Sequence, residues 1–275
     1  MFIKLERAQF PIVAEIIDYA GLESVFAYSV IDSIIPGNIY VDDSANPNSV
    51  FICTNQGKYL VAGDETNDVF NTAVAKFLLD ASNHIQSYDL YTSSEEWIEV
   101  LSKSLDGQAV ILRYTIYYSK KITTVDDIHL ENGFELKPID EILFEKIVRD
   151  FYPSYKNLWG SAAEFCSKSF GFCIVKNDDV LSVATAVYIG NGYAEIDIET
   201  SPYYYRKGLA YALANQFIKY CQDNNLVALW ICDSLNKKSK ALAEKLELTR
   251  AKEVEMFWWH ENRSAMNGYL NKFNS

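Results

Sequence analysis

The spacing of hydrophobic residues predicts a mixed series of helices and strands in the first part of the chain. Helical spacing covers 6–19 and 22–35 and stops at the turn pair Pro36-Gly37. Two short β-rich runs, 50–53 and 59–62, flank a turn at 55–57 and predict a hairpin. Further along, the pattern predicts a helix over 67–82, a strand over 87–91, a helix over 94–104 and a strand over 109–118.

The second part of the chain repeats this order of elements. It is expected to hold a strand over 133–138, helices over 140–151 and 159–168, strands over 170–176, 180–188 and 193–199, a helix over 206–224, a strand over 227–232, a helix over 236–246, a strand over 250–259 and a short helix over 266–275. We therefore expect a mixed α/β (α+β) fold in both halves.

The polar stretch 119–132 has no sustained hydrophobic period and is interpreted as a domain boundary. The predicted domains are 1–125 and 126–275, in keeping with a chain of 275 residues. The N-terminal domain is either a degenerate copy of the second fold or an unrelated α/β companion.

Composition excludes several classes of protein. With 49% hydrophobic residues but no apolar run near the roughly 18 to 20 residues of a membrane helix, the chain is expected to be globular and not membrane-spanning. Its start lacks the pattern of a secretory signal, so we expect a cytoplasmic protein. The five cysteines form no C-x-x-C pair and the three histidines show no ligand spacing, so no metal site is expected.

The formal charge of −12 argues against nucleic acid and anionic membrane as partners. The charge is unevenly distributed, however, because 201–250 carries eight basic and four acidic residues. That window includes a strand that leads through Arg206-Lys207-Gly208 directly into a helix. Helix N-termini carry unpaired N–H groups and a positive dipole end, and Gly208 lets an anion approach the backbone. This loop is therefore a candidate anion site, and the alternative is a solvated helix start with incidental basic residues.

Two motifs in this part resemble the GNAT superfamily of acyl-CoA-dependent N-acetyltransferases. The segment 205–210 (YRKGLA) is similar to the superfamily's R/Q-x-x-G-x-G/A, and 236–246 (NKKSKALAEKL) is similar to its N-x-x-S-x-x-L-A-E-K-L. The chain length also resembles the two-domain bacterial group that includes the zwittermicin A resistance acetyltransferase. The resemblance implies a cofactor, acetyl-CoA, held between the strands predicted at 193–199 and 227–232.

The resemblance also assigns roles to residues. Pantetheine would pair with the backbone around Ile198 to Thr200, and the pyrophosphate would rest on the N–H groups from Arg206 to Tyr211. The implied cofactor-binding residues are Ile198, Thr200, Arg206, Lys207, Gly208, Leu209, Ala210, Tyr211, Asn236 and Ser239. The chain departs from the pattern at Tyr205, where Arg or Gln is usual, at Glu247-Leu248 in place of Gly-Phe, and at Ala243, where many members place a Tyr acid. We expect the first departure to weaken cofactor binding without abolishing it.

Candidate catalytic carboxylates alternate along the strand predicted at 193–199. Glu195, Asp197 and Glu199 share one face, where neighbouring carboxylates raise one another's pKa as a general base requires. By the family's pattern Glu195 is the first candidate and Glu199 the second; the alternative is an ordinary polar strand face.

The expected activity is transfer of an acetyl group from acetyl-CoA to a primary amine of a small molecule, directly in a ternary complex. The alternatives are a non-catalytic acyl-CoA-binding or regulatory module and an enzyme for longer acyl chains. In the first half, the equivalent loop 62–68 carries three acids that would repel phosphate, so no cofactor is expected there. The aromatic segment 256–259 is expected to be either core or the surface of a homodimer.

Overall fold

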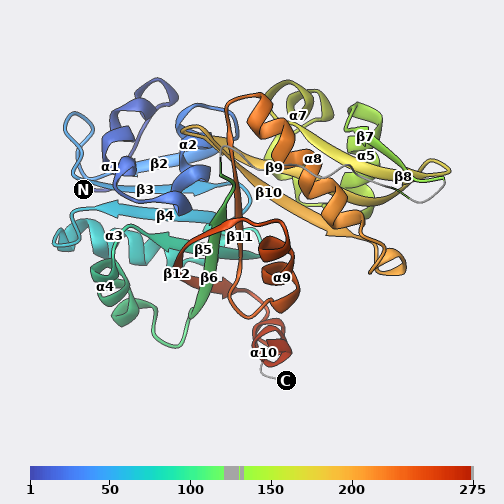
Figure 1. Ribbon diagram of the computed structural model, residues 1–275. Helices are drawn as coiled ribbons and strands as arrows, with labels where there is room; N and C mark the ends of the chain where they lie inside the picture. The colour runs from blue at the N-terminus through green and yellow to red at the C-terminus, as the bar shows by residue number, and fades with distance from the viewer. Residues whose placement is uncertain (121–129, 131–132, 274–275) are drawn as a thin grey trace. The chain divides into compact units, whose positions relative to one another are not determined.

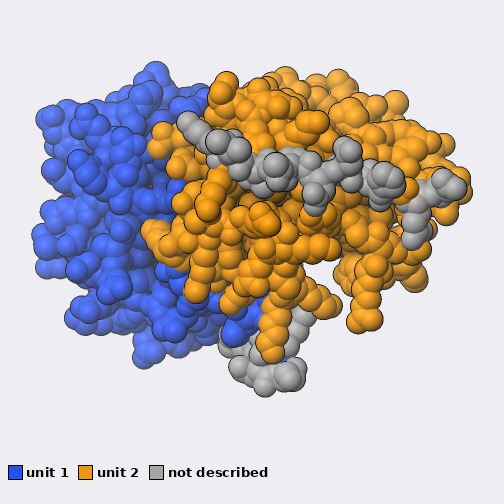
Figure 2. Space-filling view, viewed as in Figure 1, with its two compact units in different colours: residues 1–114, 233–236, 253–275 blue, residues 115–232, 237–252 orange. Residues whose placement is uncertain are grey.

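The computed structural model describes residues 1–120, 130 and 133–273. Contacts divide the chain into two compact units, coloured in Figure 2. Unit 1 comprises Met1–Tyr114, Asp233–Asn236 and Glu253–Ser275, and unit 2 comprises Thr115–Cys232 and Lys237–Lys252. The predicted domain boundary between residues 125 and 126 lies outside the described residues.

Unit 1 is built on strands joined in the order β1-β2-β3-β4-β5-β12-β6 (Figure 1). The strands are β1 (Ile3–Lys4), β2 (Gly37–Val41), β3 (Ser49–Thr54), β4 (Lys58–Gly63), β5 (Ser87–Thr92), the first part of β6 (Val110–Tyr118) and the second part of β12 (Thr249–His260). Its helices are η1 (Arg7–Val13), α1 (Ala14–Asp18), η2 (Leu22–Ser24), α2 (Val25–Ile31), α3 (Asp68–Leu79), η3 (Ala81–Asn83), α4 (Glu95–Leu105) and α10 (Arg263–Phe273).

Nearly every residue of the β3–β4 hairpin is buried, because helices cover both faces of the two strands. One face packs against α3 and α4 through Phe51, Phe70 and Trp97, and the other face contacts α1 and α2. The aromatic segment 256–259 lies here, where Met256 and Phe257 are buried and Trp259 stacks on Tyr88. The expectation that this segment contributes to a core is thus confirmed for Met256 and Phe257.

Unit 2 contains strands joined in the order β7-β8-β9-β10-β11. They are β7 (Glu135–Pro138), β8 (Gly171–Lys176), β9 (Asp179–Gly190), β10 (Tyr193–Thr200) and β11 (Val227–Asp233, whose last residue belongs to unit 1). The helices are α5 (Glu141–Asp150), α6 (Tyr155–Trp159), α7 (Ala162–Lys168), η4 (Pro202–Tyr204), α8 (Leu209–Asp223) and α9 (Lys237–Lys245). All described neighbours pair antiparallel except β10 and β11, which are parallel.

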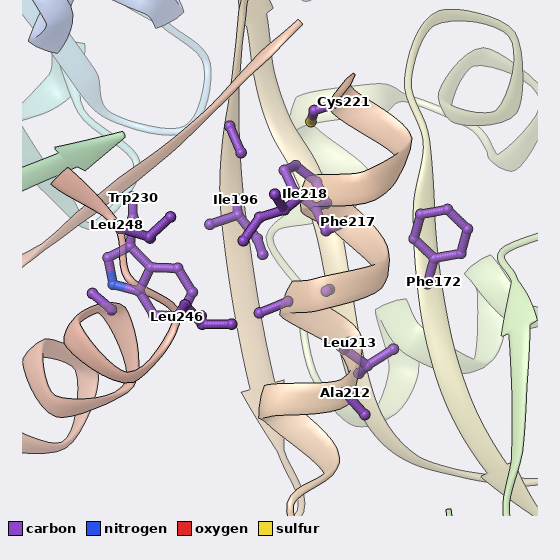
Figure 3. Packing of buried hydrophobic residues seen from close by; sticks show 14 of the residues in the cluster. Phe172, Ile196, Ala212, Leu213, Phe217, Ile218, Cys221, Trp230, Leu246 and Leu248 are labelled. Atoms are coloured by element: carbon purple, nitrogen blue, oxygen red, sulfur yellow. The ribbon is translucent and has the colours of Figure 1, made fainter. Parts of the chain in front are cut away.

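The core of unit 2 lies beneath α8, whose apolar face contacts β8, β9 and β10. Phe217 is fully buried and stacks on Phe170, with ring centroids 5.0 Å apart. Figure 3 shows Ile218 of α8 beside Ile196 of β10, and Trp230 grouped with residues that follow α9. Burial of this face fixes the position of the N-terminal end of α8 relative to β10.

The mixed α/β fold expected from the sequence is confirmed, with local differences: β1 and α6 were not predicted, and three further differences concern longer elements. The prediction missed β2, because the turn pair Pro36-Gly37 was taken as the end of a helix and not as the approach to a strand. Helix α8 begins at Leu209 and not at residue 206, since the left-handed φ of Arg206 and Gly208 is incompatible with a helix. The last predicted strand was assigned to the second half, yet Met256–His260 pairs with β5.

Candidate active site

Strands β10 and β11 run side by side for only part of their length. Their parallel pairing covers Tyr193, Ala194 and Glu195, whereas β10 continues to Thr200. On its other edge β10 stays paired with β9 to its end, although the register shifts at Glu195, where Val187 is an extra residue on β9. Such a bulge increases local twist and bends the strand. Glu195 therefore marks the point where β10 leaves β11.

Beyond that point, alternate backbone groups of β10 face the edge that β11 has left. The carbonyl of Glu199 accepts a hydrogen bond from the Ser182 hydroxyl of β9, and the N–H of Ser201 donates to Leu181. Since backbone groups alternate in direction along an antiparallel strand, those of Ile198 and Thr200 face away from β9. The structure thus gives Ile198 and Thr200 the orientation that pairing with an extended ligand requires.

The loop between β10 and α8 ends in two residues of left-handed conformation, Arg206 with φ 63° and Gly208 with φ 76°. Gly208 is the N-cap of α8 and provides no side chain to cap the helix. The first hydrogen bond within the helix runs from the N–H of Ala212 to the carbonyl of Gly208. Because first-turn N–H groups have no partner within a helix, those of Leu209 to Tyr211 are oriented toward the loop. A Cβ added to Gly208 would meet nothing within 4 Å, so the approach to these groups is open.

Basic side chains from α9 lie against tyrosines on either side of this loop. The Nζ of Lys238 is 5.6 Å from the ring centroid of Tyr205, and the Nζ of Lys245 is 4.5 Å from that of Tyr211. Lys207 in the loop itself lies 5.8 Å from the ring of Phe134. Cations near the N-terminal end of a helix dipole are an arrangement that attracts anions, so the loop stays a candidate anion site.

The three carboxylates of β10 lie on one face of the strand and differ in burial. Glu195 is only 6% exposed, Asp197 is half-buried and Glu199 is exposed at its outer end. Ala194 and Ile196 point the other way, into the core beneath α8. The predicted alternation of polar and apolar residues along this strand is therefore confirmed. Its most buried carboxylate lies at the position where β10 and β11 separate.

Asp197 is bound by two tyrosines that the sequence analysis did not single out. Its carboxylate accepts hydrogen bonds from the hydroxyls of Tyr152, at 3.1 Å, and Tyr155, at 3.2 Å. Tyr155 also contacts the hydroxyl of Thr185 at 2.6 Å. Burial, followed by the charge of Asp197, raises the pKa of both tyrosines well above the ordinary value. Their hydroxyls therefore remain protonated and hold Asp197 in place.

The pKa of Glu199 is raised, first by burial and then by the negative charge of Asp197. The folded protein thus disfavours the charged form, and this group lowers stability as the pH rises above its ordinary pKa of 4.5. We expect Glu199→Gln to increase the free energy of unfolding at pH 7 relative to the unmodified protein, and this gain to shrink toward pH 4. Urea denaturation at both pH values measures it.

The control for this prediction is Glu145→Gln, which removes one carboxylate from the exposed side of α5. It should show no comparable gain at neutral pH. A gain for Glu199→Gln that is equal at both pH values would contradict the assigned cause, because a neutral carboxyl and an amide differ little in charge.

The remaining predicted residues occupy several environments. The hydroxyl of Ser239 accepts a hydrogen bond from the indole of Trp230 at 2.9 Å, so it is fixed against β11. Asn236 belongs to the segment Asp233–Asn236 of unit 1. Ala243, at the position of the Tyr acid in many GNAT members, is fully buried. Tyr205, which stands where the superfamily has Arg or Gln, is 53% exposed.

In unit 1 the equivalent loop before α3 is filled by its own chain. A Cβ added to Gly63 would lie 2.0 Å from the carbonyl oxygen of Asn48. Asp64 accepts hydrogen bonds from the N–H and hydroxyl of Thr66, and Asn67 caps α3 through the N–H of Phe70. The N–H and hydroxyl of Thr66 and the N–H of Phe70 are thus paired within the chain.

The described residues lack two further features. No three or more His, Cys, Asp and Glu side chains come together there as metal ligands would. No helix among those residues combines the length and the apolar character needed to cross a membrane.

Comparisons with known proteins found relatives of this chain. A family model described as GNAT acetyltransferase matches residues 17–257. The chain is 34% identical over 233 residues to the uncharacterized N-acetyltransferase YdfB of Bacillus subtilis strain 168, covering 85% of this chain and 89% of that protein.

Solved structures show the same fold. A GCN5-related N-acetyltransferase-like protein from Streptococcus suis superposes with a TM-score of 0.71 at 23% identity, covering 92% of this chain and 99% of that one. A tandem GNAT protein from the clavulanic acid biosynthesis pathway gives a TM-score of 0.62 at 9% identity, covering 95% and 98%. Because the family model spans most of the chain and YdfB exceeds 30% identity, this protein is an N-acetyltransferase of the GNAT acetyltransferase family.

Proposed function

We propose that the protein transfers an acetyl group from acetyl-CoA to a primary amine of a small molecule, directly in a ternary complex. The observation that carries this proposal is the early end of the β10–β11 pairing at Glu195, five residues before β10 ends at Thr200. Beyond Glu195, the edge of β10 that faced β11 can pair with an extended arm that carries amide groups. This edge leads directly to the N-terminal end of α8.

The residues present fit such a cofactor. The backbone groups of Ile198 and Thr200 would hold the pantetheine arm, and the N–H groups from Arg206 to Tyr211 would receive the diphosphate. The space beside Gly208 supports this assignment, since a backbone cradle needs close approach. Leu209 contributes through its N–H alone, because its side chain is buried in the core. When bound, acetyl-CoA supplies the thioester that carries the acetyl group.

The proposed role of Glu195 is to accept a proton from the acceptor amine, which must be neutral to attack. Its burial keeps the carboxylate away from bulk water and next to the strand separation. Glu199 is the second candidate, because its raised pKa makes it a better proton acceptor near neutral pH. A departing thiol needs little help from an acid, since its pKa is about 8.5. The absence of a tyrosine at Ala243 is therefore compatible with turnover.

The proposal is tested by titrating acetyl-CoA and CoA into the protein in a calorimeter and then measuring thiol release over a panel of small primary amines. We expect saturable binding of both cofactors and thiol release that depends on the amine. No binding at millimolar cofactor would reject the proposal. Binding without thiol release from any amine would favour the alternative, a non-catalytic acyl-CoA-binding module, which the unusual Tyr205 and Ala243 motivate.

A further inference from the structure

Helix α9 presents two lysines on one side, at Lys238 and Lys245. Residues seven apart lie two turns apart on the same face of a helix, about 10 Å along its axis. Each ammonium lies over a tyrosine ring: Lys238 over Tyr205, just before the loop, and Lys245 over Tyr211, in the first turn of α8. The two contacts therefore place one ammonium beside the residue three positions before Gly208 and the other beside the residue three positions after it.

Basic residues outnumber acidic residues in and around this loop, by eight to four over 201–250. Segment 201–212 contains Arg206 and Lys207 and no acidic residue. Among the described residues, neither Lys238 nor Lys245 forms an ion pair with a carboxylate, and both side chains are exposed. Holding four cations near a positive helix terminus costs free energy that an anionic ligand would recover. The ligand favoured here carries at least two negative charges within reach of both ammoniums.

Tyr205 adds a second reason. The position before the loop offers no cationic or amide side chain of its own, because it is a tyrosine. Its ring instead holds the ammonium of Lys238 at 5.6 Å, so α9 brings a positive charge to the place where the loop lacks one.

We propose that Lys238 and Lys245 form a clamp on the diphosphate of the cofactor, each ammonium contacting one side of it while Tyr205 and Tyr211 guide the two side chains. The inference rests on the proposed function, because the diphosphate is that of acetyl-CoA. It adds two specificity-determining residues on α9 that compensate for the missing side chain at position 205.

The test is calorimetric titration of CoA and of 3′-dephospho-CoA into Lys238→Gln, Lys245→Gln and the double variant. For each single variant we expect the dissociation constant of both ligands to rise about 3- to 10-fold, the scale of exposed charge-assisted contacts. We also expect a shallower dependence of affinity on salt. The matched control is Lys219→Gln, which removes one exposed lysine from the distal part of α8 and should leave both affinities unchanged. Tyr205→Arg in the Lys238→Gln background should restore affinity.

Three results would overturn the clamp. Unchanged affinities in both single variants would remove its energetic basis. A loss of affinity for CoA but not for 3′-dephospho-CoA would show that the lysines contact the 3′-phosphate and not the diphosphate. An equal loss of affinity for Lys219→Gln would show that only the net charge of the protein matters, and not the positions of Lys238 and Lys245. These outcomes presuppose that the unmodified protein binds CoA; if it does not bind at millimolar concentration, the proposed function fails, and the clamp fails with it.

Discussion

Replacing Glu195 with glutamine is expected to lower kcat about 100-fold or more, while the affinity for acetyl-CoA stays within about 2-fold of the unmodified protein. The substitution keeps the size of the side chain and removes its capacity to take a proton. Because Glu195 is 6% exposed and lies where β10 and β11 separate, water is poorly placed to act as the base instead. Steady-state thiol release measures kcat, and calorimetry measures the affinity.

The matched variant is Glu199→Gln, four residues further along β10 and on the same strand face as Glu195. It should reduce kcat much less, because Glu199 lies at the exposed end of β10 and four residues from the point of separation. The opposite ranking would assign the base to Glu199, whose raised pKa suits that role. If Glu195→Gln turned over at the unmodified rate between pH 6 and pH 9, Glu195 would have no role as a base.

The second large effect concerns stability and distinguishes the two loops that precede long helices. Gly63→Ala should lower the free energy of unfolding by about 2–5 kcal/mol, the sum of a left-handed backbone penalty and an overpacking penalty. The φ of Gly63 is 95°, and a Cβ would lie 2.0 Å from the backbone oxygen of Asn48. That oxygen also accepts the N–H of Asp64, so the chain there has little freedom to move away.

Gly208→Ala provides the comparison, because its φ of 76° is similar but no atom lies within 4 Å of the added Cβ. It should cost only the backbone penalty of about 1–2 kcal/mol. Since the methyl group would occupy the approach to the N–H groups of α8, this variant should also weaken acetyl-CoA binding, which Gly63→Ala should not do. Urea denaturation and calorimetry on both variants measure the two effects. Equal losses of stability, or equal losses of affinity, would show that the two loops are equivalent after all.

Much of the site was predictable because its signals are local. The alternation of Glu195, Asp197 and Glu199 with Ile196 and Ile198 depends only on the two-residue period of a strand. The candidate anion loop was also a local signal, because Arg206, Lys207 and Gly208 stand directly before a predicted helix, although that helix begins at Leu209 and not at residue 206. These features lie close together in the sequence, so local patterns were enough to indicate them.

The parts that were missed depend on distant pairing. Tyr152 and Tyr155 bind Asp197 across separations of 45 and 42 residues, and no spacing rule links positions so far apart. Tyr205 and Lys238, which are in contact, are separated in the sequence by α8 and β11. The sequence showed only that Lys238 and Lys245, seven residues apart, lie on one face of a helix. Met256–His260 likewise pairs with β5, which lies far from it in the sequence. The hydrophobic spacing of one segment does not show which other strand it pairs with.

The sequence by itself determined the order of most helices and strands, the acidic strand face, the glycine loop and the membership in an acyltransferase family, because each of these is written in short-range spacing. Only the tertiary structure decided that β10 leaves β11 at Glu195, that a bulge in β9 accompanies this separation, and that α9 brings its lysines to the start of α8. The physical reason is that strand register and side-chain contact between elements are set by packing of the whole core, which no local pattern contains.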